Sequence, residues 1–142
     1  MQISTILARK GSAVVTARPA QTIREAIGLL CEKRIGALVV VDQANKPVGI
    51  VSERDIIRAA PRQEGLFGEA VSTIMTTDVI IARPTDDTKP VSQTMTVNRI
   101  RHLPVMDRGE LVGIVSIGDV VKAQLDEYEG EVETLQTRLG KG

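Results

Sequence analysis

Two short segments of the chain have almost the same sequence: residues 49–56 read GIVSERDI and residues 113–120 read GIVSIGDV. A repeat of this kind constrains the fold strongly, because it indicates that one structural unit occurs twice. In each copy an apolar run ends at a serine, and an aspartate follows three residues later. This order predicts a strand that meets the start of a helix, with a hydroxyl and a carboxylate at the junction.

Such a junction is chemically suited to hold an anion and a sugar. The first backbone N–H groups of a helix have no partner within the helix, so they attract negative charge. A carboxylate beside them can accept hydrogen bonds from both hydroxyls of a diol. The alternative is that these serines and aspartates only cap their helices, which is the usual role of Ser and Asp at a helix start.

The charge balance disfavours a nucleic-acid-binding protein. The 142 residues include 18 lysines and arginines and 18 aspartates and glutamates, so the formal net charge is zero. Proteins that bind a phosphate backbone usually carry a basic excess. Phe67 and Tyr128 are the only aromatic residues, so a stacking platform for bases is also lacking. Because aromatic residues are so few, the core must consist mainly of Val, Ile and Leu.

The single cysteine, Cys31, lies in an apolar helical stripe, and we expect it to be a small core residue in a reducing compartment. No apolar run approaches the roughly 20 residues that a membrane-spanning helix needs. The first residues also do not resemble a signal peptide. The sequence therefore predicts a cytoplasmic protein without a membrane segment.

In each half of the chain the sequence pattern predicts the order strand, helix, strand, strand, helix. In the first half we expect a strand at 14–17, a helix capped by Thr22, strands at 38–41 and 48–51, and a helix from Asp55 to about residue 60. In the second half we expect a strand at 79–83, a helix capped by Asp87, and a hairpin around the turn at 107–110. We expect domain 1 at 1–65, domain 2 at 66–125 and a helical tail at 126–142.

The last predicted helix carries apolar residues at alternating gaps of four and three, the spacing of a coiled-coil seam. The seam consists of Val121, Leu125, Tyr128, Val132, Leu135 and Leu139. A body this small cannot cover the whole stripe, so we expect the tail to pack on a second subunit. The alternative is a tail that lies back on its own domain.

Two copies of this unit, each ending in a Gly-x-x-Ser-x-x-Asp junction, resemble the cystathionine-β-synthase (CBS) domain pair, also called a Bateman module, in its small stand-alone bacterial form. The resemblance is most specific at residues 49–56 and 113–120 and covers nearly the whole chain. It implies an α+β fold in which two CBS domains are related by a pseudo-two-fold axis, followed by the helical tail. It also implies adenosine-containing ligands in the clefts between the repeats, namely AMP, ADP, ATP, NAD(H) or S-adenosylmethionine, and a homodimer.

The resemblance also implies which residues bind the ligand, with the ribose-binding junction of each cleft supplied by the opposite repeat. For the first cleft the implied residues are Ser12, Ala13, Val14, Ile35, Gly36, Ala37, Ser116 and Asp119. For the second cleft they are Ser52, Arg54, Asp55, Thr77, Asp78, Val79, Ile100, Arg101, His102 and Leu103.

The second cleft is predicted to be the tighter nucleotide site. Arg54, Arg101 and His102 can together hold a phosphate. The other junction has Gly118 where the first has Arg54, so we expect it to lack a cation. The simpler alternatives are a strand-end role for His102 and a solvated surface role for Arg101.

These features together favour a regulatory module that binds an adenine nucleotide and passes the effect to an unidentified partner protein. The chain has no phosphate-binding Gly-x-x-x-x-Gly-Lys loop, no Cys/His cluster with metal spacing and no serine elbow, so we expect neither an enzyme nor a catalytic cofactor or metal. One alternative is a dimerisation or scaffold protein whose clefts bind nothing. A nucleotide hydrolase, in which His102 and the carboxylates would support hydrolysis, is a weaker alternative.

Overall fold

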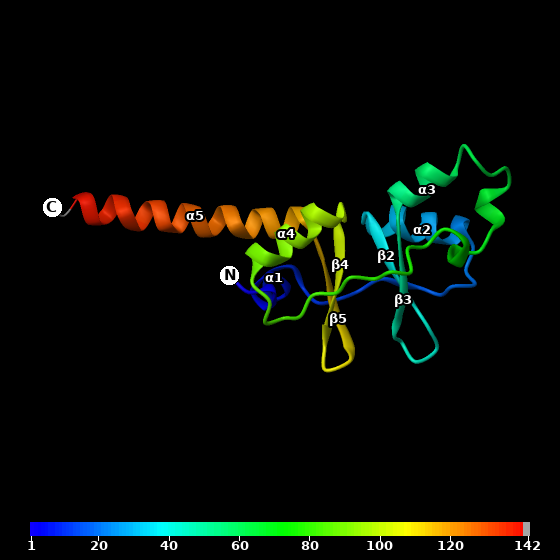
Figure 1. Ribbon diagram of the computed structural model, residues 1–142, viewed down its shortest axis with the longest axis horizontal. Coiled ribbons are helices and arrows are strands. Elements are labelled where there is room, and N and C mark those ends of the chain that lie inside the picture. Colours follow the sequence, from blue (N-terminus) through cyan, green and yellow to red (C-terminus); the bar gives the residue numbers. More distant parts are fainter. Residues whose placement is uncertain (141–142) are drawn as a thin grey trace.

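The structure is a computed structural model that describes the backbone of residues 1–140 and the side chains of residues 1–136 (Figure 1). The elements of the first half are α1 (Ile3–Lys10), β1 (Thr16–Ala17), α2 (Ile23–Lys33), β2 (Ala37–Val41), β3 (Pro47–Ser52) and α3 (Glu53–Ala59). Two short 3-10 turns follow, η1 (Leu66–Gly68) and η2 (Val71–Thr73). The second half consists of α4 (Thr88–Asn98), β4 (His102–Asp107), β5 (Glu110–Ser116) and α5 (Ile117–Gly140). The predicted α+β fold with two repeats is confirmed.

The first repeat is a three-stranded sheet of order β1-β2-β3, in which β1 is parallel to β2 and β2 is antiparallel to β3. All five residues of β2 are buried, as expected for an uninterrupted run of Ala, Leu and Val. Thr22 caps α2 by accepting a hydrogen bond from the backbone N–H of Glu25 at 3.1 Å. Cys31, however, is exposed, so the prediction of a core cysteine is wrong. The buried stripe of α2 is narrower than the periodicity suggests and consists of Ile23, Ala26 and Leu30.

In the second repeat β4 and β5 form an antiparallel hairpin, but the strand predicted at 79–83 is reduced to one parallel bridge between Ala82 and Val105. α4 begins after Asp87 as expected, although the Asp87 side chain makes no capping hydrogen bond. Its carboxylate instead accepts a hydrogen bond from the amino terminus of Met1 at 3.1 Å. A charged amine is a stronger partner than a backbone amide, and it draws the N-terminus onto the second repeat.

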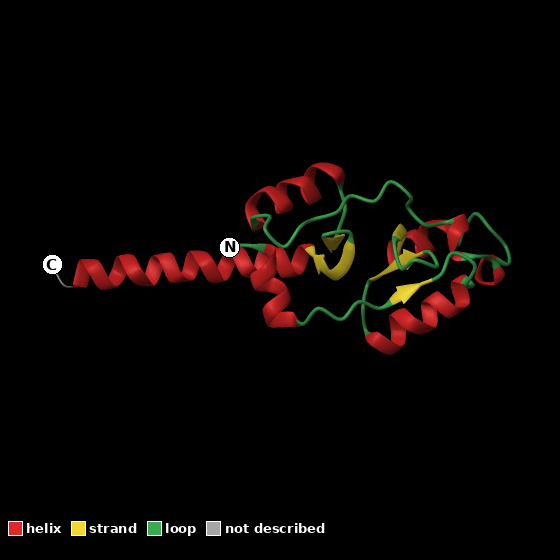
Figure 2. Ribbon diagram, turned by 90° about the horizontal axis from the view of Figure 1, so that it is seen from below, coloured by secondary structure: helices red, strands yellow, loops and turns green. Residues whose placement is uncertain are grey.

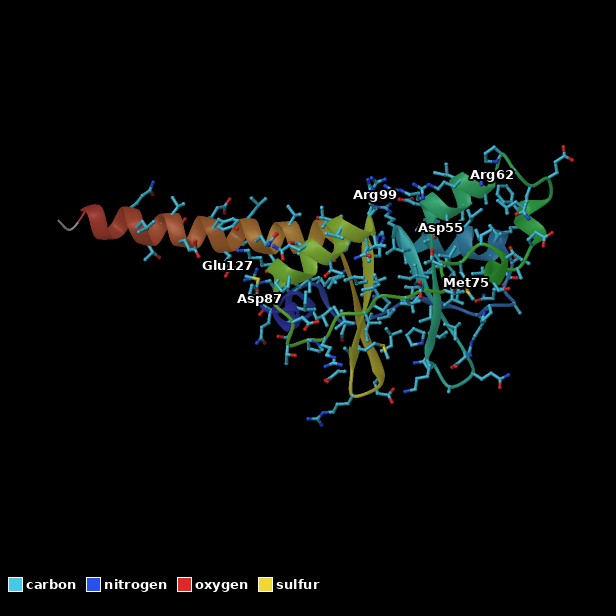
Figure 3. All side chains as sticks on the ribbon, viewed as in Figure 1. Asp55, Arg62, Met75, Asp87, Arg99 and Glu127 are labelled. Carbon is cyan, nitrogen blue, oxygen red and sulfur yellow. The ribbon has the colours of Figure 1, made fainter. Side chains whose placement is uncertain are left out.

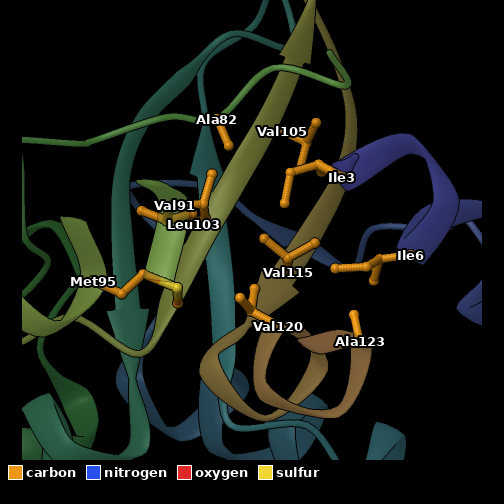
Figure 4. Packing of buried hydrophobic residues seen from close by; sticks show 10 residues of the cluster. All are labelled: Ile3, Ile6, Ala82, Val91, Met95, Leu103, Val105, Val115, Val120 and Ala123. Atoms are coloured by element: carbon orange, nitrogen blue, oxygen red, sulfur yellow. The ribbon is translucent and has the colours of Figure 1, made fainter. Parts of the chain in front are cut away.

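Each repeat completes its core with a segment that precedes the other repeat in sequence. Ile3 and Ile6 of α1 pack with β4, β5 and α5 in the second repeat (Figure 4). Leu66 and Val71, from the two 3-10 turns, pack in the first repeat. This exchange holds the repeats together, because each core includes the segment that leads into the other repeat. The domain boundary at residue 65 stays a prediction.

The glycine of each repeated segment provides space for these exchanged segments. A Cβ atom on Gly49 would lie 2.6 Å from Sδ of Met75, and one on Gly113 would lie 2.6 Å from Cδ2 of Leu7. Next to Met75, Thr76 exchanges backbone hydrogen bonds of 2.8 and 2.9 Å with Ile50 on the edge of β3. The glycines therefore belong to the packing of the fold and not to the ligand chemistry of the junctions.

The two sheets lie next to each other at the centre of the molecule, with the helices outside them (Figure 2). Lys46 in the turn of one hairpin forms an ion pair with Glu110 of the other at 3.7 Å. Helix α5 starts against α1 and α4 and then extends away from the body (Figure 1). No helix within residues 1–140 is long and apolar enough to cross a membrane.

Candidate nucleotide site

At the first junction Ser52 and Asp55 cap helix α3 and leave one carboxylate oxygen of Asp55 unused in the cap. Oδ2 of Asp55 accepts hydrogen bonds from the backbone N–H of Ser52 at 2.8 Å and from its hydroxyl at 3.0 Å. The Ser52 hydroxyl in turn accepts from the backbone N–H of Asp55 at 3.2 Å, which completes a capping box. Among the described residues nothing donates to Oδ1 of Asp55. The capping interpretation is therefore correct, and it still leaves one carboxylate oxygen for a ligand.

The second junction repeats this geometry. Oδ2 of Asp119 accepts from the backbone N–H of Ser116 at 2.9 Å, and the Ser116 hydroxyl accepts from the backbone N–H of Asp119 at 3.0 Å. Each junction is also joined to the residue just before the first strand of its hairpin, β2 in the first repeat and β4 in the second. The backbone N–H of Glu53 donates to the carbonyl of Gly36 at 3.0 Å, and that of Ile117 donates to the carbonyl of Arg101 at 2.8 Å. These bonds fix the position of each junction within its own repeat.

A cavity of about 420 Å³ lies between the repeats, beside the Asp55 junction. It brings together six of the residues predicted for the second cleft. They are Ser52, Arg54 and Asp55 from the first repeat and Ile100, Arg101 and His102 from the second. The remaining lining residues are Gly36, Ile50, Glu53, Arg58, Thr76 and Arg99. The volume is in the usual range of small-molecule sites.

Four residues predicted for this cleft do not line the cavity. Leu103 is buried in the core of the second repeat, because it follows His102 on β4 and successive side chains of a strand point to opposite faces. The segment before the second repeat contributes Thr76 in place of Thr77, Asp78 and Val79. The hydrogen bonds between Thr76 and Ile50 hold Thr76 at the edge of β3, and the chain leaves the cavity after it.

A second cavity, of about 320 Å³, lies beside the other junction. It is lined by Lys10, Gly11, Ala13, Val15, Arg34, Ile35, Gly36, Ala37, His102, Ile114 and Ser116. Ser12 and Val14 are absent from this lining, whereas Ala13 and Val15 contribute to it. The alternation of side chains in an extended segment accounts for this pattern, because Ala13 and Val15 lie on one face of the segment and Ser12 and Val14 on the other.

Asp119 does not line the second cavity. The prediction that its junction lacks a cation is wrong. Nζ of Lys10 donates to Oδ2 of Asp119 at 2.7 Å and to the carbonyl of Ile114 at 3.1 Å. Burial would raise the pKa of Asp119, but the hydrogen bonds from Lys10 and the Ser116 backbone outweigh it, so the pKa lies below its ordinary value of 3.8. The sequence does not indicate this ion pair, because Lys10 comes from the end of α1, more than a hundred residues away.

His102 lines both cavities, as does Gly36. A Cβ atom on Gly36 would lie 3.3 Å from the imidazole Nε2 and equally close to Oε1 of Glu53. Burial lowers the pKa of His102 below 6.5, and the nearby charge of Lys10 lowers it further, against the opposing effect of Glu53 and Asp119. The imidazole is therefore mainly neutral at pH 7, and it can accept a hydrogen bond or become a cation when an anion binds.

We predict that the titration midpoint of His102, measured by NMR on the imidazole signals, lies below 6.5. The measurement is unambiguous because the chain has one histidine. Since the folded state has the lower pKa, the contribution of His102 to stability is complete above pH 6.5 and is lost as the pH falls below it. A His102→Gln variant should show a smaller loss of unfolding free energy between pH 7 and pH 5.5. A midpoint at or above 6.5 would contradict this prediction.

Four cationic residues that line the cavities were not predicted as site residues from the sequence: Lys10, Arg34, Arg58 and Arg99. Arg58 lies four residues after Arg54, so helical spacing alone places both on one face of α3. Arg99 takes a left-handed backbone conformation, with φ of 55°, at the end of α4. Arg34 takes the same conformation at the end of α2, so the two arginines occupy equivalent positions in the two repeats.

The profile of the family described as CBS domain matches the chain twice, over residues 8–62 and 71–126. The chain belongs to the CBS domain family. This CBS pair is similar to the crystal structure of the CBS-domain-containing protein ATU1752 from Agrobacterium tumefaciens, with 41% sequence identity and a TM-score of 0.84. That match covers 87% of this chain and 99% of the other.

Two similar CBS structures contain adenosine compounds. The CBS pair of protein MJ0100, in complex with 5′-methylthioadenosine and S-adenosyl-L-methionine, has 28% identity and a TM-score of 0.79, covering 89% of this chain and 98% of that one. The CBS domain protein PAE2072 from Pyrobaculum aerophilum, complexed with AMP, has 33% identity and a TM-score of 0.75, covering 84% and 89%. The fold of this chain is therefore one on which other proteins bind adenosine-containing molecules.

Proposed function

We propose that this CBS pair is a regulatory module that binds an adenosine-containing nucleotide in the cavity beside Asp55. The observation that carries the proposal is the composition of that cavity, where a carboxylate from one repeat faces arginines and a histidine from the other. The free oxygen of Asp55 suits the ribose diol, and the guanidinium groups suit phosphate. The complexes of PAE2072 and MJ0100 support the same ligand class.

The regulatory part of the proposal follows from the position of the cavity. Since both repeats line it, a ligand contacts both and favours the relative position of the repeats that it fits best. A ligand shifts such an equilibrium only to the extent that it binds the two arrangements differently. The output is then a changed contact with an unidentified partner protein, and no catalytic step or cofactor is part of the proposal. An exposed free thiol at Cys31 is compatible with the reducing cytoplasm, where we place the protein.

A homodimer is the second part of the proposal. The part of the seam on α5 that the structure describes is exposed, with Val121, Leu125, Tyr128, Val132 and Leu135 between 44% and 57% accessible. The predicted seam residue Leu139 lies outside the described side chains. Within residues 1–136 no segment of the same chain covers this stripe, which supports packing on a second copy over the alternative of a tail folded back on its own domain.

Calorimetry of the whole protein against AMP, ADP, ATP, NADH and S-adenosylmethionine tests the proposed function. At least one of these compounds is expected to bind with one or two sites per chain. If none binds at millimolar concentration, the scaffold alternative with empty clefts replaces the proposal. If the nucleotide concentration falls during long incubation with the protein, the hydrolase alternative replaces it.

A further inference from the structure

Four arginines line the cavity beside Asp55, and they come from both repeats. Arg54 and Arg58 lie one turn apart on the same face of α3, while Arg99 and Arg101 belong to the segment that joins α4 to β4. Figure 3 shows Asp55 and Arg99 at neighbouring positions where the two repeats meet. The cavity is therefore flanked by guanidinium groups on two sides.

In the part of the chain whose side chains are described, none of these four arginines has an anionic partner. Within the described residues no carboxylate oxygen lies within 4.0 Å of any of them, although Arg9 pairs with Asp126 at 3.4 Å. The cavity includes two acidic residues, Glu53 and Asp55, and one oxygen of Asp55 is already used in the helix cap. Four cations against two anions leave an excess of positive charge that a bound anion would balance.

The positive charge continues away from the junction along α3. A shallower hollow of about 310 Å³ shares Asp55 and Arg58 with the main cavity and is further lined by Arg62 and Gln63. Arg62 follows Arg58 by four residues, just after the end of the helix, and Figure 3 shows it farther from the repeat junction than Asp55. Within α3 the step from Arg54 to Arg58 corresponds to about 6 Å of helix rise, and Arg62 continues the row on the turn that follows the helix.

We propose that this cavity selects nucleoside polyphosphates, such as ADP and ATP, over a monophosphate and over S-adenosylmethionine. The inference rests on the proposed function, since a ribose held at Asp55 sets the point from which the phosphates extend. A monophosphate reaches the arginines near the junction, whereas a longer chain of phosphates also reaches Arg58. S-adenosylmethionine has no phosphate, and its sulfonium and ammonium groups outweigh its one carboxylate, so its net positive charge is repelled by the same side chains.

Calorimetry without divalent metal, with ATP, ADP, AMP, S-adenosylmethionine and inorganic tripolyphosphate, tests the inference. We expect ATP to bind at least about tenfold more tightly than AMP, and more tightly than tripolyphosphate, which lacks the nucleoside. AMP or S-adenosylmethionine binding as tightly as ATP would overturn the inference while leaving the proposed function intact. Binding of tripolyphosphate as tight as that of ATP would also overturn it, and absence of binding by every adenosine compound would overturn the proposed function itself.

An Arg58→Ala variant locates the selectivity. We expect the ratio of ATP affinity to AMP affinity to fall by at least about tenfold, because the lost contact is one that the longer phosphate chain makes. The matched control, Arg83→Ala, removes an exposed arginine outside the cavities and should leave the ratio unchanged. If Arg58→Ala does not fold, Arg58→Gln removes the same charge and keeps an unbranched side chain that a helix accepts readily. An unchanged ratio in the folded variants would overturn the inference.

Discussion

Replacement of Asp55 by alanine is expected to abolish the thermal stabilisation that a bound nucleotide gives to the protein. A hydrogen bond to a charged group contributes about 1.5–3 kcal/mol, and the ribose diol offers two donors to this carboxylate. A loss of roughly 3 kcal/mol weakens binding by about a hundredfold. A ligand present at a hundred times its dissociation constant stabilises the native state by about 2.7 kcal/mol, and after the substitution it would contribute only about 0.4 kcal/mol.

The variants must separate ligand binding from helix capping, because Asp55 performs the capping role in the free protein. An Asp55→Asn variant retains an oxygen that can accept the Ser52 N–H but loses the negative charge, so it should fold normally and still bind nucleotide weakly. Asp119→Ala is the matched control, since it removes the equivalent cap from the other repeat and does not touch the cavity beside Asp55. We expect this control to melt at a lower temperature and to keep its nucleotide-induced shift.

The measurement is a thermal melt of each variant with and without ATP. For a chain of this size, 1 kcal/mol corresponds to a shift of about 2–5 °C, so the loss of stabilisation in Asp55→Ala is readily detected. A shift of the same size in Asp55→Ala and in the unsubstituted protein would mean that Asp55 does not hold the ligand. A lost shift in Asp119→Ala with an unchanged shift in Asp55→Ala would place the nucleotide in the cavity beside Ser116 instead.

The features that the sequence predicted correctly are those governed by local spacing. Ser52 and Asp55 stand three residues apart after an apolar run, and this spacing alone produces the capping box and the start of α3. The same reasoning holds at Ser116, whereas the position of the junctions beside clefts between the repeats was implied only by the resemblance to the CBS pair. Strand alternation also explains which neighbouring residues were placed wrongly, since a shift of one residue moves a side chain from the cavity to the core, as at Leu103.

The features that the sequence did not reveal depend on long-range packing. Lys10 reaches Asp119 because α1 packs on the second repeat, and nothing in the order of the repeats shows that the cores exchange segments. Cys31 is exposed because the surface that α2 buries depends on its neighbours and not on its periodicity alone. Local patterns therefore define the junctions, whereas the charge around them is determined by tertiary contacts.

A Leu135→Asp substitution is expected to convert a dimer into monomers. Leu135 is 57% exposed on a helix of 24 residues, which is about 36 Å long. Burial of a leucine contributes about 1.5–3 kcal/mol, and both copies lose it at once, so the dissociation constant should rise by at least about a hundredfold. Light scattering after size-exclusion chromatography measures the mass directly, and Thr134→Asp adds the same charge beside the seam as a matched control.

The charges on α5 are compatible with this dimer. When two copies are aligned in parallel along the seam, Glu129 faces Gln124 of the other copy and Glu131 faces its Gln136, so no like charges oppose each other at these described flanking positions. A dimer that persists in Leu135→Asp would place the interface on the body of the molecule and leave α5 free for another protein. A monomer in both variants and in the unsubstituted protein would remove the homodimer from the proposal. The cavity beside Asp55 would be unaffected, because residues of one chain line it.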